Sequence, residues 1–180
     1  MKSVCVFCGA RSGADDQWVA LAKGVGQALG QKGIRTIYGG GSVGLMGAVA
    51  GGALEAGGEV VGVIPHFLMG QELGTHDITR LEQVDDMAQR KVRMMELSDG
   101  FLTLPGGLGT LDELFEVMTL SQVGQHEKPC AILNAQGYFD SLFALFDSFV
   151  QAGFVGQEHV DRLLIHSDVD PLFKQLLPKL

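Results

Sequence analysis

The chain has 180 residues, of which 46% are hydrophobic and 19% charged, and its formal net charge is −8 at pH 7. This length suits one domain that buries its own core, so we predict a single nucleotide-binding domain over residues 1–180. The acidic balance argues against nucleic acid or an anionic membrane as partner. Without a stretch of roughly 20 apolar residues or a signal-peptide pattern, we expect a cytoplasmic protein that binds a small molecule.

Short apolar runs rich in β-formers alternate with amphipathic helical patterns. The predicted strands are Ser3–Phe7, Arg35–Tyr38, Val60–Ile64, Asp77–Val84, Phe101–Leu104 and Cys130–Leu133. The predicted helices are Asp15–Gln31, Leu45–Glu55, Met87–Leu97, Thr110–Val123, Tyr138–Gln151 and a short closing helix near Pro171–Leu177. Such alternation predicts an α/β fold: a Rossmann-like, doubly wound, mainly parallel sheet with helices on both faces. Ligands bind at the carboxyl ends of the strands in such sheets.

The first predicted strand leads into Cys5-x-x-Cys8, a spacing found in redox and metal half-sites. The chain has no second pair of this kind, and residues three apart on a strand face opposite sides of a sheet. We therefore interpret both as buried structural cysteines. The histidines lack the HExxH pattern or any paired-ligand spacing, so we expect no bound metal.

The first glycine-rich segment, Gly39–Gly44, satisfies Gly-x-Gly-x-x-Gly between a strand and a helix. The acidic residue expected about 20 positions later, which would hold a ribose hydroxyl, is missing, and no Gly-Lys-Ser or Gly-Lys-Thr follows. NAD, FAD and a Walker A loop are therefore disfavoured. Gly41 and Ser42 are candidates for close approach of a ligand, with backbone packing as the open alternative.

The second glycine-rich segment, PGGLGTLDE from Pro105 to Glu113, stands between a predicted strand and a predicted helix. Glycines let backbone N–H groups approach an anion, and the first N–H groups of a helix add partial positive charge. The segment therefore predicts a nucleotide phosphate site. Glu113 either serves chemistry there or bonds back toward Thr110 in a capping box. With Asp112 and Glu116 it forms an acidic cluster, which needs a cationic counterpart.

Arg90 and Lys91 are the candidates for that counterpart. Arg90 shares one helical face with apolar residues such as Met87 and Met94, so we expect it to be partly desolvated and to need an anion. Alternatively, the Arg90 side chain forms a salt bridge to a carboxylate or is solvated at the edge of its helix. For Lys91 the alternative is a surface lysine whose stem lies along apolar surface.

Four segments resemble the Lonely Guy family: CVFCGA, YGGGSVGLMGAVA, the Arg90-Lys91 pair and PGGLGTLDE. The resemblance covers almost the full chain. It implies a phosphoribohydrolase that releases free base and ribose 5-phosphate from cytokinin riboside 5′-monophosphates or related adenine nucleotides such as AMP. It also implies at least a homodimer, and the chemistry requires no metal or organic cofactor. A pyridoxal-phosphate decarboxylase would need a Schiff-base lysine, for which Lys91 lacks a partner pattern.

Carried over residue by residue, the resemblance implies that Arg90 and Glu113 are the catalytic pair. The other motif positions and two further positions are implied to bind the substrate: Glu72, Lys91, Gly107, Leu108, Gly109, Thr110, Leu111, Asp112 and Thr119. The chain departs from the family where Ser, His and Trp are usual, at Ala10, Ala88 and Leu120. The alternative function is a non-catalytic nucleotide or cofactor carrier or sensor of the same fold, because fold alone does not fix function.

Overall fold

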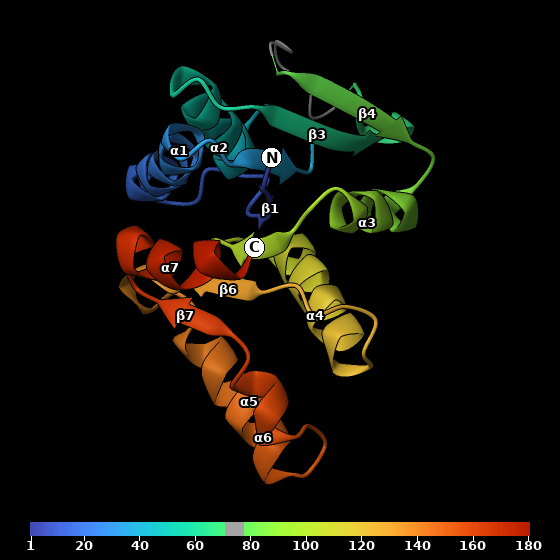
Figure 1. The fold of residues 1–180 in the computed structure, drawn as a ribbon, viewed down its shortest axis with the longest axis vertical. Helices are drawn as coiled ribbons and strands as arrows, with labels where there is room; N and C mark the ends of the chain where they lie inside the picture. The colour runs from blue at the N-terminus through green and yellow to red at the C-terminus, as the bar shows by residue number, and fades with distance from the viewer. Residues whose placement is uncertain (71–77) are drawn as a thin grey trace.

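The computed structural model describes residues 1–70 and 78–180 (Figure 1). Within them, seven strands form one sheet in the order β4-β3-β2-β1-β5-β6-β7, and every neighbouring pair is parallel. The strands are β1 (Ser3–Phe7), β2 (Arg35–Tyr38), β3 (Val60–Pro65), β4 (Arg80–Val84), β5 (Gly100–Thr103), β6 (Cys130–Leu133) and β7 (Leu164–His166). The predicted parallel α/β sheet is confirmed.

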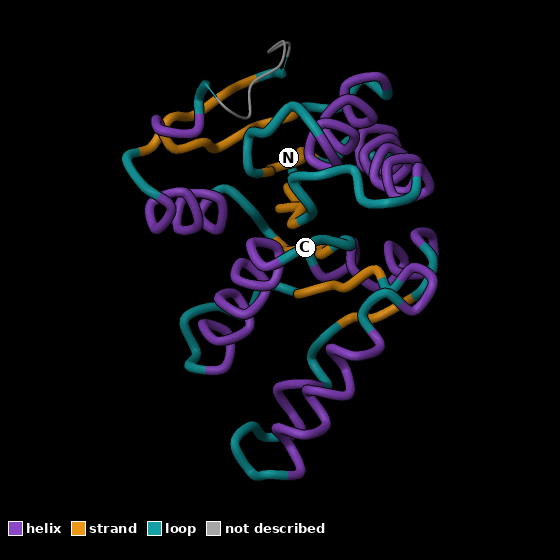
Figure 2. Tube along the Cα trace, turned by 180° about the vertical axis from the view of Figure 1, so that it is seen from behind, coloured by secondary structure: helices purple, strands orange, loops and turns teal. Residues whose placement is uncertain are grey.

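An α-helix follows each strand except β3, after which the described residues contain only a 3₁₀ turn before β4; such crossovers allow the parallel pairing. The α-helices are α1 (Asp16–Gln31), α2 (Gly44–Glu55), α3 (Met87–Glu96), α4 (Leu108–Gln122), α5 (Asp140–Gln151), α6 (Gln157–Val160) and α7 (Val169–Leu176). Short 3₁₀ turns are η1 (His66–Leu68), η2 (Ala135–Gly137) and η3 (Leu177–Lys179). The two termini lie side by side in both views (Figures 1 and 2), where Lys2 Nζ donates to the carbonyl of Leu180.

Two apolar layers cover the two faces of the sheet. One layer packs α1, α2 and α7 against Val4 and Val6 of β1, and the other packs α3, α4 and α5 against Cys5 and Phe7. Cys8 belongs to the first layer and Cys5 to the second, and both thiols are free and buried. The interpretation of these residues as structural cysteines on opposite faces is confirmed.

Glycines bring α1 and α2 unusually close together. A Cβ added to Gly26 would overlap the carbonyl oxygen of Val49, and one added to Gly52 would overlap that of Lys23. This backbone contact compensates for the low helix propensity of glycine, which costs up to about 1 kcal/mol per residue in a helix interior. The contact between α1 and α2 also holds α2, and with it the glycine-rich loop that precedes α2, in place relative to the sheet.

Several boundaries differ from prediction, and two elements were not predicted. Asp77, the predicted first residue of the fourth strand, lies outside the described residues, and the strand begins at Arg80, after Ile78 and Thr79. Helix α4 begins at Leu108 rather than Thr110, and β7 and α6 were not predicted. In the part of the chain that the structure describes, no helix is long and apolar enough to cross a membrane.

Candidate functional site

The strand order reverses direction at the boundary between β1 and β5. The chain proceeds from β1 toward one edge of the sheet through β2, β3 and β4, and from β5 toward the other edge. A crevice at the carboxyl ends of the strands is expected at such a point. The loops after the two strands are joined there, because the N–H of Gly9 donates to the carbonyl of Pro105 at 3.1 Å.

A pocket of about 850 Å³ opens at this boundary. Its walls come from the loops after β1, β2 and β5, from α1, α2, α3 and α4, from the 3₁₀ turn η1 and from the turn after β6. The lining includes Gly9, Ala10, Arg11, Trp18, Gly39, Met46, Met87, Arg90, Gly106, Gly107, Leu108, Gly109, Thr110, Glu113 and Tyr138. The predicted catalytic pair and the core of the PGGLGTLDE segment therefore face one cavity.

The PGGLGTLDE segment places the start of α4 at the pocket. Gly107 is the N-cap of the helix, so the N–H groups of Leu108, Gly109 and Thr110 have no partner within it. Gly106 cannot carry a side chain here, because an added Cβ would overlap Thr110 Oγ1. These donors and the helix dipole together favour a phosphate.

Glu113 is a residue of the α4 interior and not part of a cap. With Gly107 as N-cap, Thr110 is the third helical residue and Glu113 the sixth, so the capping-box alternative is wrong. Desolvation raises the pKa of the Glu113 carboxyl to about 7, although the nearby Arg90 guanidinium acts in the opposite direction. The Glu113 carboxyl therefore titrates closer to neutral pH than an ordinary glutamate.

Arg90 is buried, with only 6% of its surface exposed. Its Nη2 donates to the carbonyl oxygen of Gly39 at 2.9 Å, and the thioethers of Met87 and Met46 lie 3.6 and 3.9 Å from its terminal nitrogens. Its Nε is buried and has no hydrogen-bond partner among the described residues. The alternatives of a solvated helix edge or a carboxylate salt bridge do not fit these contacts. A buried cation with a free donor beside a pocket is suited to an anionic or hydroxylated ligand.

Lys91 is directed toward α4 and away from the pocket. Its Nζ lies 3.0 Å from Asp112 Oδ2 and 2.5 Å from Glu116 Oε2, and these carboxylates, Glu116 first, raise its pKa. The side chain is only 19% exposed, so it is not a free surface lysine. It is the cationic counterpart of the acidic cluster, and it ties α3, which carries Arg90, to α4, which carries Glu113. Among the described residues, the pocket lining does not include Lys91 or Asp112.

Other predicted substrate contacts lie outside the pocket lining of the described residues. Leu111 packs into the apolar layer, and the segment after β2 contributes Gly39 instead of Gly41 or Ser42. The packing alternative accounts for Ser42, because its carbonyl occupies the space of a Cβ on Gly47. Glu72 falls outside the described residues.

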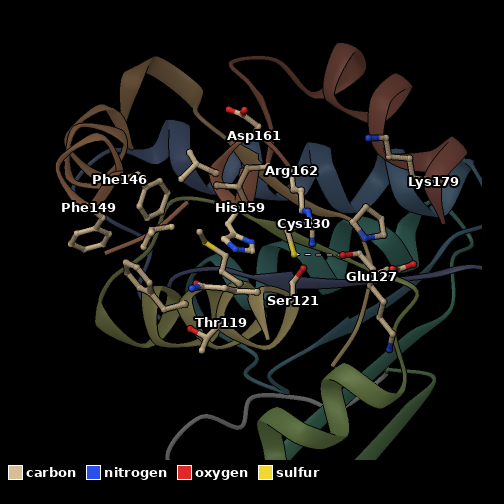
Figure 3. A pocket seen from close by; sticks show the side chains of 18 residues that line it. Thr119, Ser121, Glu127, Cys130, Phe146, Phe149, His159, Asp161, Arg162 and Lys179 are labelled. Atoms are coloured by element: carbon tan, nitrogen blue, oxygen red, sulfur yellow. Dashed lines mark hydrogen bonds between the residues drawn. The ribbon is translucent and has the colours of Figure 1, made fainter. Parts of the chain in front are cut away.

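Thr119 lines a second cavity of about 560 Å³ beside α5 and α6. Figure 3 shows it with Phe146, Phe149 and His159. The reason is helical geometry: Thr119 stands six residues after Glu113, which rotates it about 120° around the helix axis. Within a single chain, the two side chains therefore serve different cavities.

Three large side chains of the pocket were not predicted: Arg11, Trp18 and Tyr138. Arg11 and Tyr138 each follow a strand at its carboxyl end, which was the available signal. The rings of Trp18 and Tyr138 meet edge to face, with centroids 5.4 Å apart. Ala10, where the family usually has Ser, also lines the pocket.

Comparison with known proteins shows the family to which the chain belongs. A family model described as possible lysine decarboxylase matches residues 46–176. The cytokinin riboside 5′-monophosphate phosphoribohydrolase of Rhodococcoides fascians is 44% identical over 170 residues, which cover 94% of this chain and 86% of that protein. The chain belongs to the Lonely Guy family.

Plant relatives and solved structures extend the comparison. The cytokinin riboside 5′-monophosphate phosphoribohydrolase LOG3 of Arabidopsis thaliana is 41% identical over 179 residues, covering 99% of this chain and 81% of the relative. The structure of the molybdenum cofactor carrier protein of Chlamydomonas reinhardtii superposes with a TM-score of 0.73 at 20% identity, covering 98% of each chain. At that identity the likeness shows the fold alone. The Lonely Guy fold is thus shared with proteins of other function.

Proposed function

We propose that this Lonely Guy protein hydrolyses the N-glycosidic bond of cytokinin riboside 5′-monophosphates and related adenine nucleotides, releasing free base and ribose 5-phosphate. The names of relatives that are 41 and 44% identical support this activity. The observation that carries the proposal is the buried Arg90 beside the Glu113 carboxyl in a pocket that begins at a helix N-terminus. A carrier needs no carboxylate beside the sugar, whereas a glycosidase does.

The 5′-phosphate is assigned to the start of α4. Gly107 to Thr110 offer backbone donors there, and Arg11 is the other arginine among the described lining residues. This anchor is remote from the bond that breaks. Its binding energy can therefore orient the sugar and help lower the barrier.

Glu113 and Arg90 are assigned to the chemistry. The N-glycosidic bond breaks through a transition state in which positive charge develops on the ribose, as in glycoside hydrolysis. The Glu113 carboxylate stabilises that charge and accepts a proton from the attacking water. The base departs with the electron pair of the broken bond and takes up a proton from solvent, to which Glu113 later returns its own. A base with a pKa near the working pH is the most effective, and Glu113 has a pKa of about 7. Arg90, which lines the pocket, is assigned to a ribose hydroxyl or to the Glu113 carboxylate.

We further propose that residues 1–180 act as one domain, in a homodimer or larger homo-oligomer, in the cytoplasm. The single sheet shared by both apolar layers supports one domain. The family resemblance supports the oligomer.

The decisive experiment follows base release by chromatography from AMP, isopentenyladenosine monophosphate and adenosine. We expect both nucleotides to be cleaved, and adenosine to react at least about 10²-fold more slowly in kcat/KM, because it lacks the phosphate anchor. Equal turnover of AMP and adenosine would contradict the role of the α4 terminus. Binding of nucleotides without release of base would favour the carrier.

The activity should depend on pH through Glu113. The carboxylate is the active form and its pKa in the free protein is raised to about 7, so kcat/KM should rise about tenfold between pH 6 and pH 8 and then level off. Measurements of kcat/KM for AMP from pH 5 to 9 test this. A kcat/KM that falls across the same interval would instead assign Glu113 as a general acid.

A further inference from the structure

The peptide between Gly106 and Gly107 lies at the centre of the proposed phosphate site. Glycine imposes little restriction on the backbone dihedrals on either side, so a peptide between two glycines is prone to rotate. Nothing described lies within 4 Å of a Cβ placed on Gly107. Rotation of this peptide by half a turn would exchange the positions of an N–H donor and a carbonyl oxygen. An oxygen facing the phosphate would repel it.

One side chain holds this peptide from outside the loop. The hydroxyl of Tyr138 donates to the carbonyl oxygen of Gly106 at 2.7 Å. The carbonyl of Gly106 and the N–H of Gly107 belong to the same planar trans unit and point in opposite directions. Fixing the oxygen toward Tyr138 therefore directs the Gly107 N–H to the opposite side of the peptide.

Tyr138 is 45% exposed, and its position is held by the turn after β6 and by neighbouring rings. The N–H of Phe139 donates to Asn134 Oδ1 at 2.7 Å, and the ring of Tyr138 packs edge to face on those of Phe139 and Trp18, at 4.9 and 5.4 Å between centroids. Gln136 in this turn adopts φ of 56°, a left-handed conformation that is uncommon for a residue with a side chain. Such conformations persist where the surrounding contacts impose them. Here the Gln136 side chain bonds to Gln17 of α1.

We propose that Tyr138 is a positioning residue that locks the Gly106–Gly107 peptide in the orientation that binds the 5′-phosphate. The inference rests on the proposed function for the identity of the ligand. It gives a role to Trp18 and Tyr138 at the pocket wall. Trp18 supports the ring of Tyr138, and the Tyr138 hydroxyl fixes the orientation of the Gly106–Gly107 peptide. The lock acts through the backbone, so it affects phosphate-bearing ligands selectively.

The test is Tyr138→Phe, which removes the hydroxyl and retains the ring. Trp18 is the single tryptophan of the chain and lines the pocket, so its emission reports binding. Titrations in the Glu113→Gln background, where turnover does not interfere, compare AMP, ribose 5-phosphate and adenosine. We expect Tyr138→Phe to weaken the first two by about 3- to 10-fold, the effect of one neutral hydrogen bond, and to leave adenosine unchanged.

Tyr38→Phe is the matched control, because it removes the other tyrosine hydroxyl of the chain, which is buried outside the pocket lining. It should not alter the ratio of AMP to adenosine affinity. Unchanged AMP affinity in Tyr138→Phe, or an equal loss of affinity for AMP and adenosine, would contradict the proposed role of Tyr138. Since binding is measured directly, this result is independent of whether AMP is cleaved: absence of base release in the wild type would refute the proposed function and leave the lock testable.

Discussion

Replacing Glu113 with glutamine is expected to lower kcat for base release from AMP by about 10³-fold while changing the Kd of AMP by no more than a few-fold. Glutamine keeps the size and polarity of the side chain but can neither carry the negative charge nor accept the proton of water. Loss of electrostatic stabilisation and of general base catalysis together gives an effect of this order. The measurement is single-turnover release of adenine beside a binding titration.

The matched control for this variant is Glu96→Gln. Glu96 is an exposed carboxylate of α3 that pairs with Arg93 at 3.0 Å and does not line the pocket. Its replacement should leave kcat within about twofold, as is usual for exposed ion pairs. If Glu113→Gln still released base at the wild-type rate, the carboxylate would have no part in the chemistry.

The second large effect on activity is expected when Gly39 is replaced with alanine. A Cβ at this position would overlap Nη2 of Arg90, which donates to the carbonyl of the same glycine. The guanidinium must therefore move, and a displacement of about 1 Å in a catalytic site can cost about 10²-fold in rate. We expect kcat/KM for AMP to fall by that factor with the fold intact, as judged by circular dichroism.

Gly51→Ala provides the control for adding a methyl group. An added Cβ at Gly51, in the interior of α2, meets nothing within 4 Å, and alanine favours the helix by up to about 1 kcal/mol. Activity should stay at the wild-type level, with equal or higher thermal stability. Wild-type activity in Gly39→Ala would show that the site tolerates movement of Arg90.

The sequence allowed most of the fold to be predicted because the central strands are continuous apolar runs bounded by turns. Strand β7 was not predicted because it has only three residues, one of which, Ile165, is exposed. The start of α4 was misplaced because Thr110 is a good capping residue and so attracts the prediction. In the structure the glycine at 107 takes the cap, and Thr110 is buried against Gly106.

Prediction of the site was limited because a sequence does not show which neighbour each side chain faces once the helices pack. The helical spacing that placed Arg90 among apolar residues was sufficient to predict its burial, because the apolar face belongs to the same helix as Arg90. Lys91 and Thr119 depended on which neighbours surround their helices, and sequence spacing carries no such information. Trp18 and Tyr138 were missed for the same reason: they meet only because α1 and the turn after β6 flank one crevice.

The three buried thiols make the native chain resistant to alkylation. Burial raises the pKa of Cys130 to about 12 and those of Cys5 and Cys8 well above the ordinary value. Only a thiolate reacts readily, so labelling must await local opening of the structure around each thiol. The labelling rates of Cys5 and Cys130 then report how often β1 and β6 open, and that of Cys8 reports the segment directly after β1. Because Cys8 also lines the pocket, a bound nucleotide should slow its labelling more than that of Cys130.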